Sequence, residues 1–212
     1  MSFRIISGDL TEMETDAVVN AANSGLRPGG GVCGAIFAAA GYEDLERACA
    51  ALGHCETGHA VLTEGFALKA KYVIHAVGPV WRGGGEGEAE LLRECYQNAL
   101  LLAKEHRCHS VAFPLISSGI YGFPKDKALE CAKEAIGDFL TVHEMDVYLV
   151  LFKGDAGALA LKGEGFSEDP RDDNGSVGGR CCFMERNRRF LKNLQSRGME
   201  TVENDGNGED KN

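Results

Sequence analysis

Long hydrophobic runs, tryptophan and proline are scarce in this 212-residue sequence, which has one tryptophan and five prolines. No apolar stretch approaches the roughly 18 residues that suggest a membrane-spanning helix. The first residues, MSFRIISGDL, also lack the pattern of a signal peptide. These absences predict a protein of the cytoplasm without membrane partners. The length fits one domain with an extension or two small domains.

Cysteine spacings typical of metal sites are also missing, although the chain has eight cysteines. No CxxC pair and no zinc-type histidine spacing occurs. Several cysteines, such as Cys95 and Cys131, lie on apolar faces of expected helices, where a thiol behaves as a small hydrophobic group. We therefore expect reduced core thiols rather than disulfides, and neither a metal nor a cofactor. The cysteines are Cys33, Cys49, Cys55, Cys95, Cys108, Cys131, Cys181 and Cys182.

Positive charge is in short supply, since the net charge is −10. Residues 1–152 carry −8 of this charge and residues 153–212 carry −2. Binding to nucleic acid depends on Lys and Arg contacts with phosphates, so a nucleic-acid partner is not favoured. An acidic domain that binds a phosphate ligand must do so mainly with backbone N–H groups.

Short apolar runs alternate with helical patterns up to residue 152. The helical patterns lie at about 34–40, 43–52, 88–105 and 126–141, with apolar residues spaced along one face of the two longer ones. Interleaving of this kind predicts a layered α/β domain with a mixed, largely parallel six-stranded sheet. The predicted strands are residues 3–7, 16–20, 59–63, 72–76, 110–114 and 146–152.

The character of the chain changes after the domain expected at 1–152. Residues 153–180 are rich in glycine and acidic residues and are typical of a linker. Residues 181–198 form a possible basic amphipathic helix, which either docks a partner or, the favoured interpretation, is a weakly packed extension. Residues 199–212 are expected to be disordered.

Two glycine-rich loops point to a ligand site. GGGVCG contains G-x-G-x-x-G, but it is separated from the preceding strand and no acidic residue follows in the right context, so a Rossmann dehydrogenase is not favoured. FPLISSGIYGFPKDKA, residues 113–128, runs from a strand through small residues into a helix. Backbone amides in such loops converge on anions. Two loops at strand carboxyl ends predict opposing walls of one crevice that binds a diphosphate.

Four ordered motifs resemble the macrodomain family: SGDLTEMETDAVVNAAN, GGGVCGAIFAAAG, TGHAVLTEGFALKAKYVIHAVGP and AFPLISSGIYGFPKDKA. The resemblance covers residues 3 to about 152. It implies a three-layer α/β/α fold that binds ADP-ribose, closest to the subgroup that hydrolyses O-acetyl-ADP-ribose and ADP-ribose esters on acidic side chains. The implied partners are ADP-ribose, ADP-ribosylated proteins or O-acetyl-ADP-ribose, bound by a monomer.

The resemblance also implies residue roles. Asp9 binds the adenine amino group or, alternatively, caps a turn. Phe152 stacks on adenine unless it is a core residue. Asn23 and Tyr121 face the distal ribose, and loop amides hold the diphosphate. The implied ligand-binding set is Asp9, Leu10, Asn23, Gly30, Gly31, Val32, Cys33, Ser117, Ser118, Gly119, Ile120, Tyr121, Gly122 and Phe152, and the implied catalytic set is Asn23, Cys33 and Tyr121.

Cys33 departs from the family pattern, because many hydrolytic relatives have an aspartate after GGGV. Three interpretations are open. A ligand phosphate orients the water, with Asn23 and the loops positioning the ester; or Cys33 acts as nucleophile or base, although the sequence offers no evident histidine partner; or Cys33 is inert and the domain only binds ADP-ribose. His75 is expected to be structural. A further alternative is a scaffold for RNA or poly-ADP-ribose that uses residues 180–197.

Overall fold

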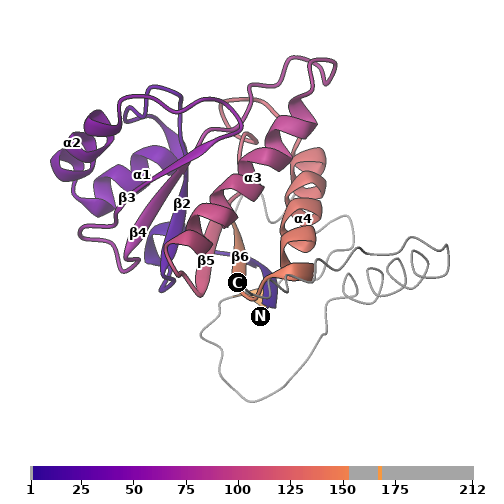
Figure 1. Cartoon of the computed structure of the whole chain (residues 1–212). Coiled ribbons are helices and arrows are strands. Elements are labelled where there is room, and N and C mark those ends of the chain that lie inside the picture. The colour runs from indigo at the N-terminus through magenta and orange to yellow at the C-terminus, as the bar shows by residue number, and fades with distance from the viewer. Residues whose placement is uncertain (1, 153–166, 169–212) are drawn as a thin grey trace, which may run out of the picture. The chain divides into compact units, whose positions relative to one another are not determined.

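The computed structural model describes residues 2–152 and the pair 167–168. Its strands form one seven-stranded sheet in the order β3-β4-β2-β5-β6-β1-β7, with β3 antiparallel to β4 and all other neighbours parallel (Figure 1). The strands are β1 (Ser2–Ser7), β2 (Ala17–Ala21), β3 (Ala60–Glu64), β4 (Tyr72–Ala76), β5 (Ser110–Pro114), β6 (Asp146–Leu151) and β7 (Ser167–Glu168).

The first six strands agree with the predicted ranges to within one residue at each end. The two-residue β7 pairs with the end of β1, adds a seventh strand to the six predicted, and lies inside the segment 153–180 that the sequence predicts as a linker. The rest of the linker, the possible helix 181–198 and the tail 199–212 lie outside the described residues.

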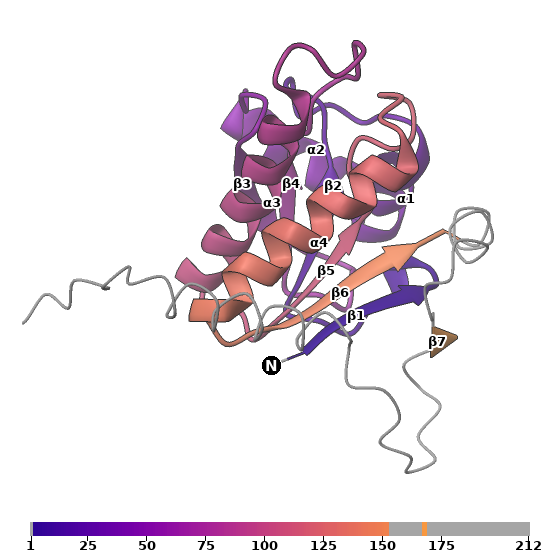
Figure 2. The same ribbon diagram turned by 90° about the vertical axis from the view of Figure 1, so that its right-hand side faces the viewer.

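Four α-helices cover the sheet: α1 (Gly31–Ala40), α2 (Tyr42–Leu52), α3 (Glu88–Glu105) and α4 (Lys125–Val142). In Figure 2, α3 and α4 lie in front of the sheet and α1 and α2 behind it, which confirms the three-layer α/β/α class. A short 3-10 helix, η1 (Leu10–Glu12), follows β1. Helix α1 begins at Gly31, three residues before the predicted start.

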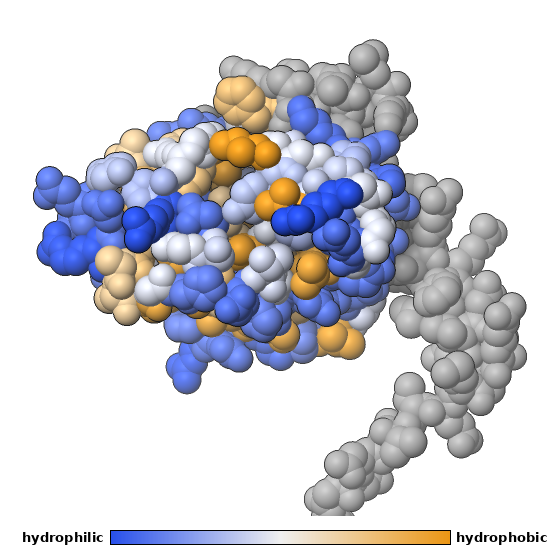
Figure 3. All heavy atoms as spheres, turned by 90° about the horizontal axis from the view of Figure 1, so that it is seen from above, coloured by the Kyte–Doolittle hydropathy of each residue, from blue (hydrophilic) through white to orange (hydrophobic). Residues whose placement is uncertain are grey.

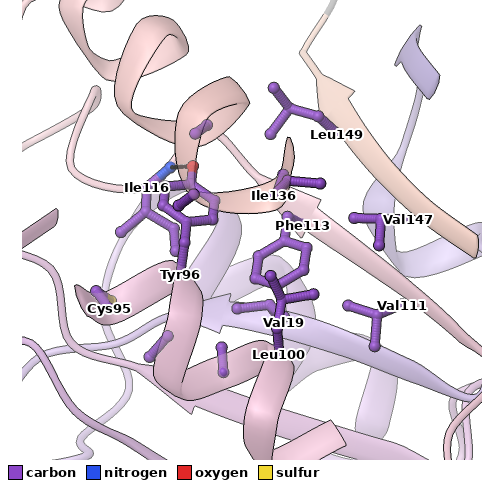
Figure 4. Close-up of a cluster of buried hydrophobic side chains, with 14 of the residues drawn as sticks. Val19, Cys95, Tyr96, Leu100, Val111, Phe113, Ile116, Ile136, Val147 and Leu149 are labelled. Carbon is purple, nitrogen blue, oxygen red and sulfur yellow. Dashed lines mark hydrogen bonds between the residues drawn. The ribbon is translucent and has the colours of Figure 1, made fainter. Parts of the chain in front are cut away.

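Hydrophobic patterning explains the layers. β2 is apolar almost throughout because helices cover both of its faces. Helices α3 and α4 each bury a stripe of residues spaced three and four apart. Their face of the sheet packs around Tyr96, Phe113 and Ile136 (Figure 4). Within this apolar layer the Tyr96 hydroxyl donates to the Pro114 carbonyl (3.1 Å) and accepts from the Ile116 N–H (3.0 Å), which anchors the chain that leaves β5.

The cores on both faces of the sheet include thiols. All six cysteines in the described part of the chain are buried and free, as predicted: Cys33, Cys49, Cys55, Cys95, Cys108 and Cys131. No group of three or more His, Cys, Asp or Glu among the described residues is arranged to hold a metal ion. Nor is any helix within residues 2–152 long and apolar enough to cross a membrane.

Candidate ligand-binding site

A cavity of about 570 Å³ lies where the chain leaves β1, β2, β5 and β6. Ligands of open α/β sheets bind at this carboxyl edge. In the view from above, apolar and hydrophilic side chains are interspersed across the surface (Figure 3). The lining residues are Gly8, Asp9, Leu10, Thr11, Ala21, Ala22, Asn23, Gly29, Gly30, Gly31, Val32, Cys33, Ala35, Gly78, Pro114, Leu115, Ile116, Ser117, Ser118, Gly119, Ile120, Tyr121, Val150 and Phe152.

Every residue of the ligand-binding set implied by the sequence lines this cavity except Gly122. The Gly122 amide is already used, since it donates to the Gly119 carbonyl at 2.9 Å in the turn that closes the second loop. The two glycine-rich loops therefore lie on one cavity.

The first wall of the cavity consists of Asn23 and residues 29–33, and Asn23 shapes it. Its side-chain Oδ1 accepts the Arg27 N–H (3.1 Å) and its Nδ2 donates to the Arg27 carbonyl (2.7 Å). An amide oxygen has two lone pairs and its nitrogen two hydrogens, so one acceptor and one donor position remain beyond this pair. Asn23 thus folds the loop and keeps capacity for a ligand hydroxyl.

The N-terminus of α1 forms the rest of the first wall. Its N-cap, Gly30, makes no side-chain cap, and the N–H groups of Gly31, Val32 and Cys33 belong to the turn that has no intrahelical acceptors. A Cβ at Gly34 would lie 2.6 Å from the Gly29 carbonyl oxygen, so only glycine allows this close approach. The result is a helix N-terminus that favours an anion in the cavity.

Cys33 is buried in that turn, with 5% of its surface exposed. Its sulfur lies 3.6 Å from Asn20 Nδ2, which donates to it, and Asn20 Nδ2 lies 3.1 Å from His75 Nδ1. His75 Nε2 is 3.0 Å from the Thr63 hydroxyl. The histidine that sequence reasoning did not connect to Cys33 is therefore linked to it through Asn20 and does not contact it directly.

His75 is fully buried, and burial lowers its pKa to about 4. It is therefore neutral at pH 7, one ring nitrogen facing Asn20 and the other Thr63. This confirms the structural role expected for it. Asn20 Oδ1 is also buried and has no hydrogen-bond partner within the described part of the chain.

The second wall runs from Ser117 to Tyr121. The Phe123 N–H donates to the Ser117 carbonyl (3.0 Å), and the Trp81 N–H donates to the Tyr121 carbonyl (2.9 Å). The Ser117 hydroxyl is buried without a partner among the described residues. Gly119, Ile120 and Tyr121 give their N–H groups to no backbone acceptor there. This wall therefore presents unused donors to the cavity.

The two walls approach each other at Ile120. Its side chain is 84% exposed, yet a Cβ on Gly30 would lie only 3.3 Å from Ile120 Cδ1. Behind it, burial and the neighbouring Cys33 thiol raise the pKa of Tyr121, so its phenol is neutral at pH 7.

Asp9 and Phe152 lie at the end of the cavity formed by β1 and β6. Asp9 Oδ1 accepts from the Thr11 N–H (2.9 Å) and from the Thr11 hydroxyl (2.7 Å), so Asp9 does cap η1. Phe152 is 74% exposed, which excludes the core alternative for this ring.

Sequence reasoning missed several lining residues. Gly8, Thr11, Ala21, Ala22 and Gly29 are adjacent to predicted positions, so a wider reading of the strand ends would find them. Gly78 is different, because a Cβ there would collide with the Ser117 hydroxyl and the Ile116 side chain. Such a contact comes from tertiary packing and has no local signal. The remaining missed residues are Ala35, Pro114, Leu115, Ile116 and Val150.

The fold and the cavity together define an α/β protein with a pocket between two glycine-rich loops at the carboxyl edge of its sheet. The chain belongs to the macro domain family, whose family model, described as Macro domain, matches residues 19–132. This confirms the resemblance seen in the motifs.

Relatives agree with this assignment. The chain is 49% identical over 162 residues to a Salmonella newport protein named O-acetyl-ADP-ribose deacetylase, covering 74% of this chain and 90% of that protein. A solved structure of the Oceanobacillus iheyensis macrodomain with ADP is 38% identical, with a TM-score of 0.69 over 74% of this chain and 87% of that one. A Trypanosoma brucei macrodomain in complex with ADP-ribose is 36% identical, with a TM-score of 0.68 over 76% and 68% of the two chains.

Proposed function

We propose that this protein binds ADP-ribose in the cavity between the two loops. The observation that supports this most is the convergence of unused main-chain N–H groups from the α1 N-terminus and from residues 119–121 on one cavity. Such donors bind a diphosphate without cationic side chains, which suits a domain with a charge of −8. The related structures with ADP and ADP-ribose support the same ligand.

The two ends of the cavity suit the two ends of that ligand. Phe152 offers an exposed ring for stacking on adenine, and Asp9 has a second carboxylate oxygen beside it for the adenine amino group. At the other end Asn23 and Tyr121 face the distal ribose. The diphosphate then lies between the glycine-rich loops.

We further propose that the protein hydrolyses esters of ADP-ribose, either O-acetyl-ADP-ribose or ADP-ribose on Asp and Glu side chains. Water adds to the ester carbonyl carbon, the bond between that carbon and the ribose oxygen breaks, and the ribose oxygen takes a proton, so the products are a carboxylic acid and ADP-ribose with a free hydroxyl. The name of the Salmonella relative supports this class of reaction.

The residues of the cavity favour a water oriented by the ligand. Among the residues that line it, Asp9 alone is acidic, and we place Asp9 at the adenine end. Cys33 reaches His75 only through Asn20, and the thiol that contacts His75 directly, at 3.6 Å from Nε2, is that of Cys49, which does not line the cavity. A ligand phosphate, Asn23 and the loop amides are left to hold the water and the ester.

The alternative function is a reader that binds ADP-ribose without turnover. The observation that favours it is the same Cys33, whose buried sulfur accepts from Asn20 in the position where many relatives have an aspartate.

Two measurements test these proposals. Calorimetric titration with ADP-ribose tests binding, and the absence of heat at millimolar ligand would refute it. Release of ADP-ribose from a glutamate-modified protein, by wild type and Cys33→Ala against the rate without enzyme, tests turnover. Equal rates for the two proteins above that baseline support a ligand-oriented water. Loss of rate in Cys33→Ala with binding retained supports a catalytic thiol. A baseline rate for wild type with binding intact supports the alternative, a domain that binds ADP-ribose without turnover.

A further inference from the structure

We propose that Glu88 is a positioning residue for the ADP-ribose pocket, acting through Trp81 on the wall that contains Tyr121. The inference rests on the proposed binding of ADP-ribose for its effect on affinity. Glu88 is the first residue of α3 and does not line the cavity.

The Glu88 carboxylate organises the loop that precedes it. Its Oε1 accepts the N–H groups of Arg82 (2.9 Å) and Gly84 (3.0 Å), and its Oε2 accepts the N–H of Glu86 (2.7 Å). These hydrogen bonds, that from Arg82 foremost, lower the pKa of Glu88 to about 2. The side chain is 3% exposed, so one buried and ionised group holds three main-chain donors in place.

The organised loop in turn fixes the Trp81 ring. A Cβ on Gly84 would lie 2.6 Å from Trp81 Cη2, so the indole lies directly on the Gly84 backbone. The Trp81 ring also packs against the Phe123 ring, with centroids 4.6 Å apart, and Lys127 Nζ lies 5.0 Å from the Trp81 ring centroid. Trp81 is thereby clamped between the loop and the residues that follow the second wall.

Trp81 then holds the second wall through its main chain. Its N–H donates to the Tyr121 carbonyl at 2.9 Å, while Phe123, which packs on the Trp81 ring, donates its own N–H to the Ser117 carbonyl at 3.0 Å. Tyr121 and Ser117 both line the cavity. A shift of the loop 82–86 therefore moves the wall at two points, one at each of its ends.

The chain provides a matched control for this arrangement. Asp16 Oδ2 accepts the N–H groups of His109 (2.7 Å) and Ser110 (2.9 Å) and the Ser110 hydroxyl (3.1 Å). Asp16 precedes β2 and Ser110 begins β5, so this cluster lies at the opposite end of the strands from the cavity. It has the same chemistry as Glu88 but no connection to the wall.

The experiment compares wild type with Glu88→Gln, Gly84→Ala and Asp16→Asn in the full chain. A glutamine at position 88 cannot accept the Glu86 N–H at its nitrogen. The methyl group that Gly84→Ala adds collides with the Trp81 ring, and the alanine also strains the backbone at its φ of +87°, while the Glu88 carboxylate itself is retained. For Glu88→Gln and Gly84→Ala we expect ADP-ribose to bind about tenfold more weakly by calorimetry. For Asp16→Asn we expect thermal destabilisation with an unchanged Kd.

A ligand-free readout separates this inference from the proposed function. Trp81 is the only tryptophan, so its fluorescence reports on the clamp, and hydrogen exchange of its amide reports on the bond to Tyr121. Faster exchange and altered emission in Glu88→Gln and Gly84→Ala, but not in Asp16→Asn, support the inference even if wild type fails to bind ADP-ribose. Unchanged exchange, or equal weakening of binding by Asp16→Asn, overturns it.

Discussion

The two faces of the sheet bury their polar groups differently, although both reach the same cavity. On the face of α3 and α4, the Tyr96 hydroxyl donates to the Pro114 carbonyl and accepts the N–H of Ile116, a residue that lines the cavity next to the second wall. On the face of α1 and α2, the chain Thr63, His75 and Asn20 ends at Cys33 in the first wall and leaves Asn20 Oδ1 without a partner in the described part of the chain. The second wall thus depends on two hydrogen bonds of the neutral Tyr96 hydroxyl, and the first wall depends on His75, a group that can take up a proton.

The largest difference between the faces is expected on acidification. The folded pKa of His75, about 4, is lower than the value near 6.5 in the unfolded chain, so the unfolded state binds more protons between these values. Stability is therefore complete above pH 6.5 and falls as the pH drops to 4, by about 3 kcal/mol. Urea unfolding of wild type from pH 7 to pH 4 measures this loss.

His75→Gln is the control for the titration, because Gln has no charge to gain. The difference between wild type and this variant should shrink towards acid pH, while carboxylate titrations cancel. Parallel pH profiles for the two proteins would show that His75 is not the source of the loss.

A smaller effect is expected on the other face from Tyr96→Phe. Removal of the hydroxyl leaves the Ile116 N–H and the Pro114 carbonyl buried without a partner, which costs about 2 kcal/mol in the free energy of unfolding. This loss should not vary between pH 7 and pH 5, since burial raises the Tyr96 pKa and keeps the phenol neutral. Urea unfolding at the two pH values measures it.

Tyr148→Phe is the matched control for that variant. Its hydroxyl has no hydrogen-bond partner among the described residues, and the stacking of Arg4 on its ring survives the change. An equal loss in both variants would contradict the role given to the Tyr96 hydroxyl.

The smallest effect is expected from Cys33→Ala. A thiol is a weak acceptor, so loss of its 3.6 Å contact with Asn20 should lower the free energy of unfolding by about 1 kcal/mol. Because burial alone sets the pKa shift of His75, the acid profile should keep its shape. A cost above about 3 kcal/mol in urea unfolding would mean that the polar chain is held together at its Cys33 end.

The sequence predicts the elements better than their contacts. Short apolar runs, nearly continuous in DAVVN, locate the strands to within a residue, but the antiparallel β3 and the place of β1 beside β6 depend on partners far apart in the chain. The two glycine-rich loops predict the cavity, because their composition can be recognised within a short stretch of sequence. The meeting of Asn20 with His75 is a matter of register between β2 and β4, which no local pattern encodes.

The walls of the cavity also have a consequence for how this pocket changes over generations. Every amino acid except proline supplies the same main-chain N–H, so exchanges at Val32, Gly119 or Ile120 alter the outline of the pocket and not its donors. Substitutions in these loops during evolution therefore change which molecules fit the pocket, while the main-chain N–H groups that bind an anion are retained. Proline scanning, rather than alanine scanning, is the way to map such a pocket.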